Sequence, residues 1–295
     1  MHFDPAQLAA LSAVLRHGGF EAAAQDLGLT QSAVSQRIKA LETRAGAQLV
    51  TRAKPCTGTE AGRRLAAHAD QVALLEAQLS GDLSALAPKP QTRIRLALPA
   101  DSLATWFLDA LGDLPDHLFE LSIDDQDHSA DWLRRGEVLG AVTAQPDPAP
   151  GCDALPLGAL PYVATASSAF IALHFPAGVT AETLARAPML RFNPKDQLQH
   201  LWIERVTGTR LSPPTHGLPS SEGFVQACRL GIGWGMNPVP LVARDLADGH
   251  LVALADGARI DTPLYWQTPR LMAPALAPLT RAVKRAARRH LSDHP

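Results

Sequence analysis

Three carboxylates stand within four residues of one another after a predicted strand in the middle of the chain. Carboxylates this close repel one another unless a cation compensates them. The ammonium or guanidinium group of a ligand would supply that charge, so this segment is a candidate site for a cationic small molecule. The alternative is a solvated loop in which Asp127 or Ser129 caps the next helix. The candidate side chains are Asp124, Asp125, Asp127 and His128.

Hydroxyl, amide and carboxylate side chains at predicted helix starts form a second candidate group. Backbone N–H groups at a helix N-terminus, with hydroxyls beside them, can hold the carboxylate of a ligand. Three predicted helices begin in this way, at residues 103–114, 196–206 and 221–230. The alternative at each position is a side chain that only caps its helix. The candidates are Ser102, Thr105, Asn193, Asp196, Ser220 and Ser221.

A third candidate group is the run of hydroxyl, amide and basic side chains at residues 30–39. Val34, Ile38 and Leu41 have the spacing of one buried helix face, so the polar side chains between them face outward. Short hydroxyls and amides near a helix start can reach base edges in the major groove of DNA, whereas Arg and Lys suit phosphates. An ordinary helix with a solvated face is the alternative. The DNA-binding candidates are Thr30, Gln31, Ser32, Ser35, Gln36, Arg37 and Lys39, with Arg52 and Lys54 on a following hairpin.

Three helices and a small hairpin are predicted around these DNA-binding candidates. An apolar stripe predicts a first helix that ends at a glycine pair, followed by an Ala-rich helix at residues 20–27 and a third at 31–45. A glycine turn separates the last two helices, and residues 48–57 suit a β-wing. This order predicts a winged helix-turn-helix over residues 1–58, a domain that binds double-stranded DNA.

A long helix is predicted after the wing, over residues 59–86. Leu or Val recurs along it every seven residues, which is the spacing of a short coiled-coil seam, so we expect it to join copies of the chain in a homodimer or homotetramer. The alternative is a helix packed on its own domain. Two prolines then predict a hinge, and the linker helix is assigned to residues 59–88. The seam consists of Leu65, Val72, Leu79 and Leu86, with Leu75 and Leu83 beside it.

Strand and helix patterns alternate beyond the hinge, which predicts α/β units on parallel sheets. Two sets of such units are followed by a last strand and helix that return to the first set. The sequence therefore predicts a sensor over residues 91–295, with lobe I at about 91–160 and 264–295 and lobe II at about 161–263. The fold class is α+β multidomain, and the cleft between two such lobes is a usual place for a ligand.

Composition argues against several other classes of protein. Hydrophobic residues make up 46% of the 295, but no run of about 18 apolar residues could span a membrane. The N-terminus has no basic segment followed by an apolar run, so no signal peptide is predicted and a cytoplasmic location is expected. The three cysteines are scattered, which argues against disulfides and a zinc site. No metal or cofactor is predicted.

Catalytic patterns do not support an enzyme. Residues 231–236 begin like a dinucleotide-binding fingerprint, but Met236 replaces the third glycine and the segment precedes or forms a strand. The chain has no G-x-S-x-G or H-E-x-x-H motif, and its histidines lack metal-ligand spacing. We therefore predict no catalytic residues.

The chain resembles the LysR-type transcriptional regulators. The resemblance rests on AAAQDLGLTQSAVSQRIKALE at residues 22–42, on QLVTR followed by TGTEAG, and on the helix after them. One departure is Val50, where the family usually has Phe. The family joins a winged helix-turn-helix and a linker helix to a sensor like that of periplasmic binding proteins. The resemblance implies double-stranded DNA, a small-molecule effector and RNA polymerase as partners.

The sensor more narrowly resembles the ArgP-type subgroup. The matching stretches are ADSLATWFLDAL, DDQDHSADWLRRGEVLGAVTAQPDP, RFNPKDQLQ and LPSSEGF. The resemblance implies a dimer or tetramer that responds to lysine or arginine and controls a basic amino-acid exporter gene. A role as inhibitor of replication initiation has also been described in this subgroup. The alternatives are a LysR-type regulator with a different effector, and an amino-acid-binding protein without a regulatory role.

Overall fold

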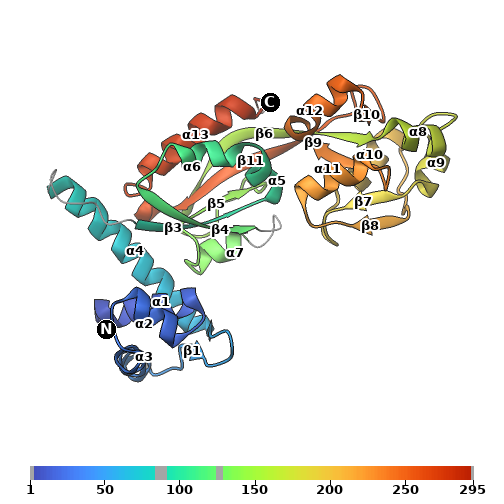
Figure 1. Ribbon diagram of the computed structural model, residues 1–295. Coiled ribbons are helices and arrows are strands. Elements are labelled where there is room, and N and C mark those ends of the chain that lie inside the picture. Colours follow the sequence, from blue (N-terminus) through green and yellow to red (C-terminus); the bar gives the residue numbers. More distant parts are fainter. Residues whose placement is uncertain (1–2, 84–91, 124–128, 294–295) are drawn as a thin grey trace.

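The computed structural model describes residues 3–83, 92–123 and 129–293 (Figure 1). A small helical domain lies at one end, a long helix leads away from it, and the rest forms two α/β lobes side by side. The predicted three helices, hairpin and long helix are all present in the N-terminal part. Its elements are α1 (Pro5–His17), α2 (Phe20–Asp26), α3 (Gln31–Ala45), β1 (Val50–Thr51), β2 (Thr57–Gly58) and α4 (Glu60–Leu83).

The apolar faces of α1, α2 and α3 share one core in the N-terminal domain. The prediction that Val34, Ile38 and Leu41 pack inward is confirmed, because each is at most 1% exposed. The hydroxyl of Thr30 accepts a hydrogen bond from the backbone N–H of Ala33 (3.2 Å), so Thr30 caps α3. The third helix therefore presents a fixed polar face to the outside.

Helix α4 divides its buried side chains between the N-terminal domain and the sensor. Ala66 belongs to the N-terminal core, whereas Leu74 is buried in the main core of the lobes. Of the predicted seam, Leu65 and Val72 are half-buried, and Leu75 beside them is 44% exposed. The other seam side chains lie outside the part that the structure describes. Part of the seam packs within the chain, and the dimer contact stays a prediction.

One mixed sheet runs through both lobes with the strand order β10-β6-β11-β5-β3-β4, in which β9 also pairs with β6; β9 (Gly235–Pro238) and β10 (Val252–Ala253) belong to lobe II, and the other strands carry lobe I. Strand β3 runs parallel to β4 and β5, whereas β11 is antiparallel to β5 and β6. The prediction of parallel sheets is therefore wrong for the two longest strands, which run in opposite directions between the lobes (Figure 1). The strands are β3 (Thr92–Leu98), β4 (His117–Ile123), β5 (Gly140–Thr143), β6 (Cys152–Ala166) and β11 (Ile260–Pro269). The helical segments are α5 (Ala100–Ser102), the π-helical η1 (Leu103–Phe107), α6 (Leu108–Gly112), α7 (Ser129–Arg134), η2 (Arg270–Met272) and α13 (Ala277–His290).

Lobe II surrounds the far ends of β6 and β11. Its helices are α8 (Ser168–His174), α9 (Ala181–Arg186), α10 (Leu198–Thr207), α11 (Ser221–Arg229) and α12 (Val239–Asp248). Its strands are β7 (Met189–Arg191), β8 (Thr215–Gly217), β9 (Gly235–Pro238) and β10 (Val252–Ala253). The rings of Trp202 and Trp234 lie 5.2 Å apart in its core. Among the described residues, no helix has the length and apolar character to cross a membrane.

Candidate functional site

The candidate DNA-binding side chains lie along the open face of α3 and on the hairpin beside it. Ser35 and Arg37 are half-buried at the edge of this face, and the other candidates after Thr30 are exposed. The exposed ones are Gln31, Ser32, Gln36 and Lys39 on α3, with Arg52 and Lys54 on the hairpin. Hydroxyl and amide groups therefore occupy the first turns of α3, the part of a recognition helix that meets base edges.

Two contacts hold the hairpin beside α3. The carboxylate of Glu42 accepts hydrogen bonds from the backbone N–H groups of Leu49 (2.9 Å) and Val50 (3.4 Å). The guanidinium of Arg52 lies 5.4 Å from the centre of the Phe20 ring, which is a cation–π contact with α2. Glu42 of α3 thus holds the backbone at the start of the hairpin, and the side chain of Arg52 packs on α2. Sequence analysis did not identify this positioning role of Glu42.

A cavity of about 310 Å³ lies between the two lobes. Its walls come from residues 99–101 after β3, Tyr162 and Thr262 on the crossing strands, residues 192–201, and the elements α11 and β9. Small-molecule sites span about 300–1,000 Å³, so this cavity suits a ligand of amino-acid size. Both lobes contribute polar side chains to it.

The carboxylate of Asp101 connects the two lobes across this cavity. The hydroxyl of Tyr162 donates a hydrogen bond to Oδ2 (2.7 Å), and the hydroxyl of Ser221 donates one to Oδ1 (2.6 Å). Asp101 follows β3 in lobe I, whereas Ser221 opens α11 in lobe II. Burial raises the pKa of the Asp101 carboxyl, and the hydrogen bonds from the two hydroxyls oppose that rise. A ligand cation beside Asp101 would favour its charged form in the same way.

A second carboxylate, that of Asp196, lines the same cavity. It accepts hydrogen bonds from the backbone N–H groups of Phe192 (2.9 Å) and Leu198 (3.0 Å), which fix its position. Asn193 shapes the same turn, because its Oδ1 accepts a hydrogen bond from the backbone N–H of Asp196 (3.1 Å). The charge of Asp196 contributes to the raised pKa of Asp101. The two carboxylates therefore repel, and a cation between them would relieve that repulsion.

Ion pairs join α4 to lobe I and so connect the N-terminal domain to the sensor. Arg95 on β3 pairs with Asp70 on α4 at 3.0 Å. Arg63 on α4 pairs with Glu137 at 3.1 Å, and Arg135 pairs with the same carboxylate at 3.2 Å. Burial raises the pKa of the Asp70 carboxyl, and the charge of Arg95 opposes that rise. Charged contacts thus accompany the buried Leu74 where α4 meets lobe I.

Comparison with protein families accounts for both parts of the chain. Residues 5–63 match the family described as bacterial regulatory helix-turn-helix protein, lysR family, and residues 87–288 match the LysR substrate binding domain. The chain belongs to the LysR family. It is therefore a DNA-binding transcription regulator with an effector-binding domain, as the sequence resemblance implied.

Named relatives of this LysR-type regulator are similar over nearly its full length. The transcriptional regulator LysG of Mycobacterium tuberculosis strain H37Rv is 46% identical over 284 residues, which cover 96% of this chain and 93% of LysG. The crystal structure of ArgP from Mycobacterium tuberculosis covers 100% of both chains with a TM-score of 0.81 and 44% identity. Full-length LysG from Corynebacterium glutamicum with bound effector Arg has a TM-score of 0.67 and 37% identity, covering 98% of this chain and 99% of that one. The predicted fold class is confirmed.

Three predicted effector residues of this regulator come together in the cavity. Asn193 and Asp196 lie in the turn before α10, and Ser221 lies at the start of α11. The predicted acidic group lies outside the described residues, so its part in the cavity stays a prediction. It comprises Asp124, Asp125, Asp127 and His128.

Three other predicted effector residues do not line the cavity. Ser102 is fully buried and is not among the residues that line the cavity. The hydroxyl of Thr105 donates to the backbone oxygen of Asp101 (2.6 Å), so it supports the segment that carries the carboxylate. The hydroxyl of Ser220 accepts a hydrogen bond from the backbone N–H of Gly223 (3.1 Å), which makes Ser220 the N-cap of α11. Capping, which sequence analysis weighed as the alternative, describes Ser220, whereas the supporting contact of Thr105 was not predicted.

Sequence analysis missed the residues at the centre of the cavity, Asp101 and Tyr162. Asp101 directly precedes Ser102 at a predicted helix start, where an acidic residue is common because it favours the helix dipole. Its neighbours therefore gave no reason to single it out. Tyr162 lies in a strand with no polar pattern, and only the fold brings it to Asp101.

Proposed function

We propose that this LysR-type regulator senses arginine or lysine in the cavity between its lobes. The observation that carries the proposal is the presence of two carboxylates, Asp101 and Asp196, in one cavity of amino-acid size. Two acidic groups at one site are unfavourable unless a cation joins them. The LysG relative that was solved with bound Arg supports a basic amino acid as that cation.

The two ends of such an effector have complementary surroundings in the cavity. Its side-chain cation pairs with Asp101 and Asp196, which face the cavity from different lobes. Its α-carboxylate suits the start of α11, because a helix N-terminus carries partial positive charge, and Lys195 adds a cation to the wall. An effector bound in this way contacts both lobes at once. Binding would then bias the lobes towards one arrangement, which is the physical requirement for a switch.

Titration calorimetry on the full chain with arginine, lysine, leucine and glutamate tests the proposal. We expect the two basic amino acids to bind more tightly than the others. Asp101→Asn should raise the dissociation constant of the better ligand by about 30-fold or more, because unpairing a charge in a desolvated site costs about 2–5 kcal/mol. Asp116→Asn, at an exposed position remote from the cavity, is the matched control. Tighter binding of leucine or glutamate would refute charge pairing and leave a LysR-type regulator with another effector.

We propose further that the polar face of α3 reads the operator and that α4 joins two copies of the chain. A two-fold dimer matches an operator whose half-sites lie one helical turn, or a multiple of it, apart. The exposed Leu75 on α4 supports this contact, since a large apolar side chain gains from burial. Light scattering should show Leu75→Lys as a smaller species than wild type, with Glu76→Lys on the same helix unchanged. An unchanged mass in both variants would move the interface to the sensor lobes.

We infer that the target is a gene for the export of basic amino acids, controlled in the cytoplasm through contact with RNA polymerase and without catalysis. The family and the sequence resemblance to the ArgP-type subgroup support this role. Chromatin immunoprecipitation with and without added arginine would test it. We expect enrichment upstream of a transporter gene whose transcript changes with arginine, and enrichment only at unrelated genes would contradict the assignment.

A further inference from the structure

The last helix of the sensor, α13, carries a concentration of positive charge that has no part in the face of α3 or in the cavity. It contains five Arg or Lys and no Asp or Glu, although the whole chain has a formal net charge of −2. The five are all exposed and are Arg281, Lys284, Arg285, Arg288 and Arg289. We propose that this basic face binds the phosphates of double-stranded DNA, at a segment separate from the one that meets α3.

Two of the five cations share one carboxylate, and the other three are left without one. Asp113, at the end of α6, pairs with Arg285 at 2.8 Å and with Arg289 at 3.8 Å. The remaining side chains make no ion pair or hydrogen bond with any described residue, and they are Arg281, Lys284 and Arg288. Their spacing of three and then four residues places them in one line along about 10 Å of the helix. The basic face thus has a row of free cations.

The stability of α13 does not account for this row of cations. Cations in the last turn of a helix favour its dipole, and the last turn here holds Arg288, Arg289 and His290. Arg281 and Lys284 lie before that turn, where the dipole adds little. Lys284 and Arg288 are four residues apart, a spacing at which like charges destabilise a helix. The free protein therefore bears a cost that a bound polyanion would remove.

The composition of the basic face favours phosphates over the surface of a protein or a membrane. A protein interface needs an apolar centre, and a membrane-bound helix inserts its apolar side. The large apolar side chains of α13, Leu279 and Val283, are instead buried in the main core. Protein–DNA interfaces are polar and strongly positive, which matches this face. Four of its five cations are arginines, whose planar guanidinium pairs with two phosphate oxygens at once.

Helix α13 and the DNA-binding candidate α3 lie well apart, with lobe I between them (Figure 1). DNA on α13 is therefore a different segment from DNA on α3. Contacts from Arg and Lys to phosphates carry no base information, so α13 would bind this segment whatever its sequence. A long duplex that bends or loops to reach both surfaces gains from the second contact, because that contact forms at a high effective concentration.

Two charge-matched variants of the full chain test the inference by fluorescence anisotropy with a random-sequence duplex of about 60 base pairs. The α13 variant combines Arg281→Gln, Lys284→Gln and Arg288→Gln, substitutions that keep a high helix propensity. The lobe II variant removes the same charge at exposed positions and combines Arg186→Gln, Arg210→Gln and Arg244→Gln.

We expect the α13 variant to bind the duplex about tenfold or more weakly than wild type, and the slope of log affinity against log salt to fall by about two to three. The lobe II variant should stay within about twofold of wild type, because it leaves the basic face intact. Equal losses in the two variants would assign the effect to net charge. Unchanged binding in the α13 variant would remove this helix from the DNA contacts. Either result overturns the inference.

Thermal unfolding without DNA gives a second readout of the same variants. The midpoint of the α13 variant should equal or exceed that of wild type, because repulsion between Lys284 and Arg288 is gone. A lower midpoint would show that these cations stabilise the fold and would count against the inference. Poly-L-glutamate and vesicles of phosphatidylglycerol should lose much less affinity than the duplex does. A loss for either that matches the loss for the duplex would assign the face to an acidic protein or to a membrane, and would overturn the inference.

Ser35→Glu separates this inference from the proposed role of α3. Because the two surfaces are far apart, their losses of duplex affinity should multiply when Ser35→Glu is combined with the α13 variant. If the α13 substitutions have no effect once Ser35→Glu is present, all contact with the duplex depends on α3. The inference about α13 then fails, and the role of α3 stands. If Ser35→Glu binds the duplex like wild type while the α13 variant does not, the reverse holds.

Discussion

The candidate DNA-binding face of α3 and the cavity between the lobes are built in opposite ways. The candidate side chains of α3 come from one continuous helix and point away from the core, so their contacts are made with solvent or a partner. The cavity takes Asp101, Tyr162, Asp196 and Ser221 from segments that are far apart in the sequence, and its polar groups contact one another. The first kind of site is encoded locally, whereas the second exists only once the chain has folded.

The two sites also depend on different physical forces. Exposed charges such as those of Lys39 and Lys54 act through water, where attraction to phosphates is strong in sum and sensitive to salt. The carboxylate of Asp101 is largely removed from water, so its single contacts count for more and depend on pH. Mutations should therefore change DNA binding and effector binding independently, except where the contacts of α4 connect them.

The largest expected effect is the loss of DNA binding in Ser35→Glu. Ser35 is half-buried at the edge of the open face of α3, so a longer acidic side chain would fill the groove and repel phosphates. We expect operator affinity in gel-shift assays to fall by about 100-fold or more, which is the loss of about two base contacts. Arginine affinity should stay within about twofold of wild type.

Thr43→Glu is the control, because it adds the same charge on α3 at an exposed position far from the helix start. It should weaken operator binding much less than Ser35→Glu does. Normal operator affinity in Ser35→Glu would remove Ser35 from the interface and leave the first turns of α3 without a reading role.

The contrast between a site encoded locally and one assembled by folding also explains how far the sequence could predict each site. The inward spacing of Val34, Ile38 and Leu41 was enough to place the polar face of α3, because helical periodicity is a local property. Asp101 could not be recognised, since its role depends on Tyr162 and on a serine of the other lobe. Only Asn193, Asp196 and Ser221 were found, because each also marks a helix start.

Long strands were harder to predict than helices for a related reason. Strand β6 runs through Pro156, Gly158 and Pro161, residues that normally end a strand. The strand continues because β11 pairs with it on both sides of a register shift at Leu264/Tyr265, and Gly158 has the positive φ of 120° that the irregularity requires. Pairing with a strand about a hundred residues later overrides the local signal. Sequence analysis missed the antiparallel pairing of β6 and β11 for the same reason, because this pairing joins segments far apart in the sequence.

A smaller effect should distinguish the two sites by their response to salt. If Lys54 contacts one phosphate as proposed, Lys54→Ala should weaken DNA binding by about tenfold or less and reduce the slope of log affinity against log salt by about one. Arginine affinity of the wild type should change much less over the same salt range, because the carboxylate of Asp101 is buried and that of Asp196 is half-buried. A steep salt dependence of arginine binding would show that the cavity attracts its ligand through exposed charges and would weaken the comparison.

The contact between α4 and lobe I should control how strongly the two sites are coupled. Glu137→Gln removes the charge that both Arg63 and Arg135 pair with, while the cavity and α3 stay intact. We expect the change in operator affinity caused by arginine to differ by about threefold from that of wild type, with each affinity alone nearly unchanged. Glu182→Gln, which removes an exposed ion pair with Arg186 in lobe II, is the control. Identical coupling in all three proteins would place the connection elsewhere.

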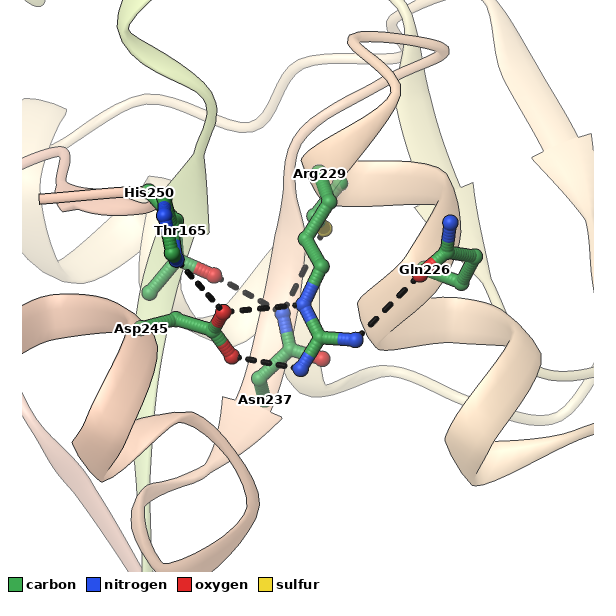
Figure 2. A network of polar contacts seen from close by, with 7 residues as sticks. Thr165, Gln226, Arg229, Asn237, Asp245 and His250 are labelled. Atoms are coloured by element: carbon green, nitrogen blue, oxygen red, sulfur yellow. Dashed lines mark hydrogen bonds and ion pairs between the residues drawn. The ribbon is translucent and has the colours of Figure 1, made fainter. Parts of the chain in front are cut away.

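The smallest expected effect concerns the pH dependence of the free energy of unfolding. The carboxylates of Asp101 and Asp245 should contribute to it with opposite signs. Burial raises the pKa of Asp101, so its charged form costs stability above the usual pKa of aspartate, and the cost disappears as the group protonates in acid. Asp245 is the opposite case, because hydrogen bonds from Arg229 (2.7 and 2.9 Å) lower its pKa (Figure 2). The charged carboxylate of Asp245 therefore stabilises the fold above the usual pKa of aspartate, and this stabilisation is lost as pH falls through its lowered pKa.

At pH 7 without ligand, Asp101→Asn should therefore raise the unfolding midpoint and Asp245→Asn should lower it. We expect changes of about 2–4 °C for each kcal/mol, with the smaller change at Asp245 because the side chain of Arg229 is 41% exposed and solvent screens the pair. Scanning calorimetry from pH 3 to 8 should show both differences shrinking towards acid. A lower midpoint for Asp101→Asn at pH 7 would mean that its two hydroxyl donors outweigh the cost of burial. Asp101 would then be a structural link between the lobes, and a cation would have less to gain by binding there.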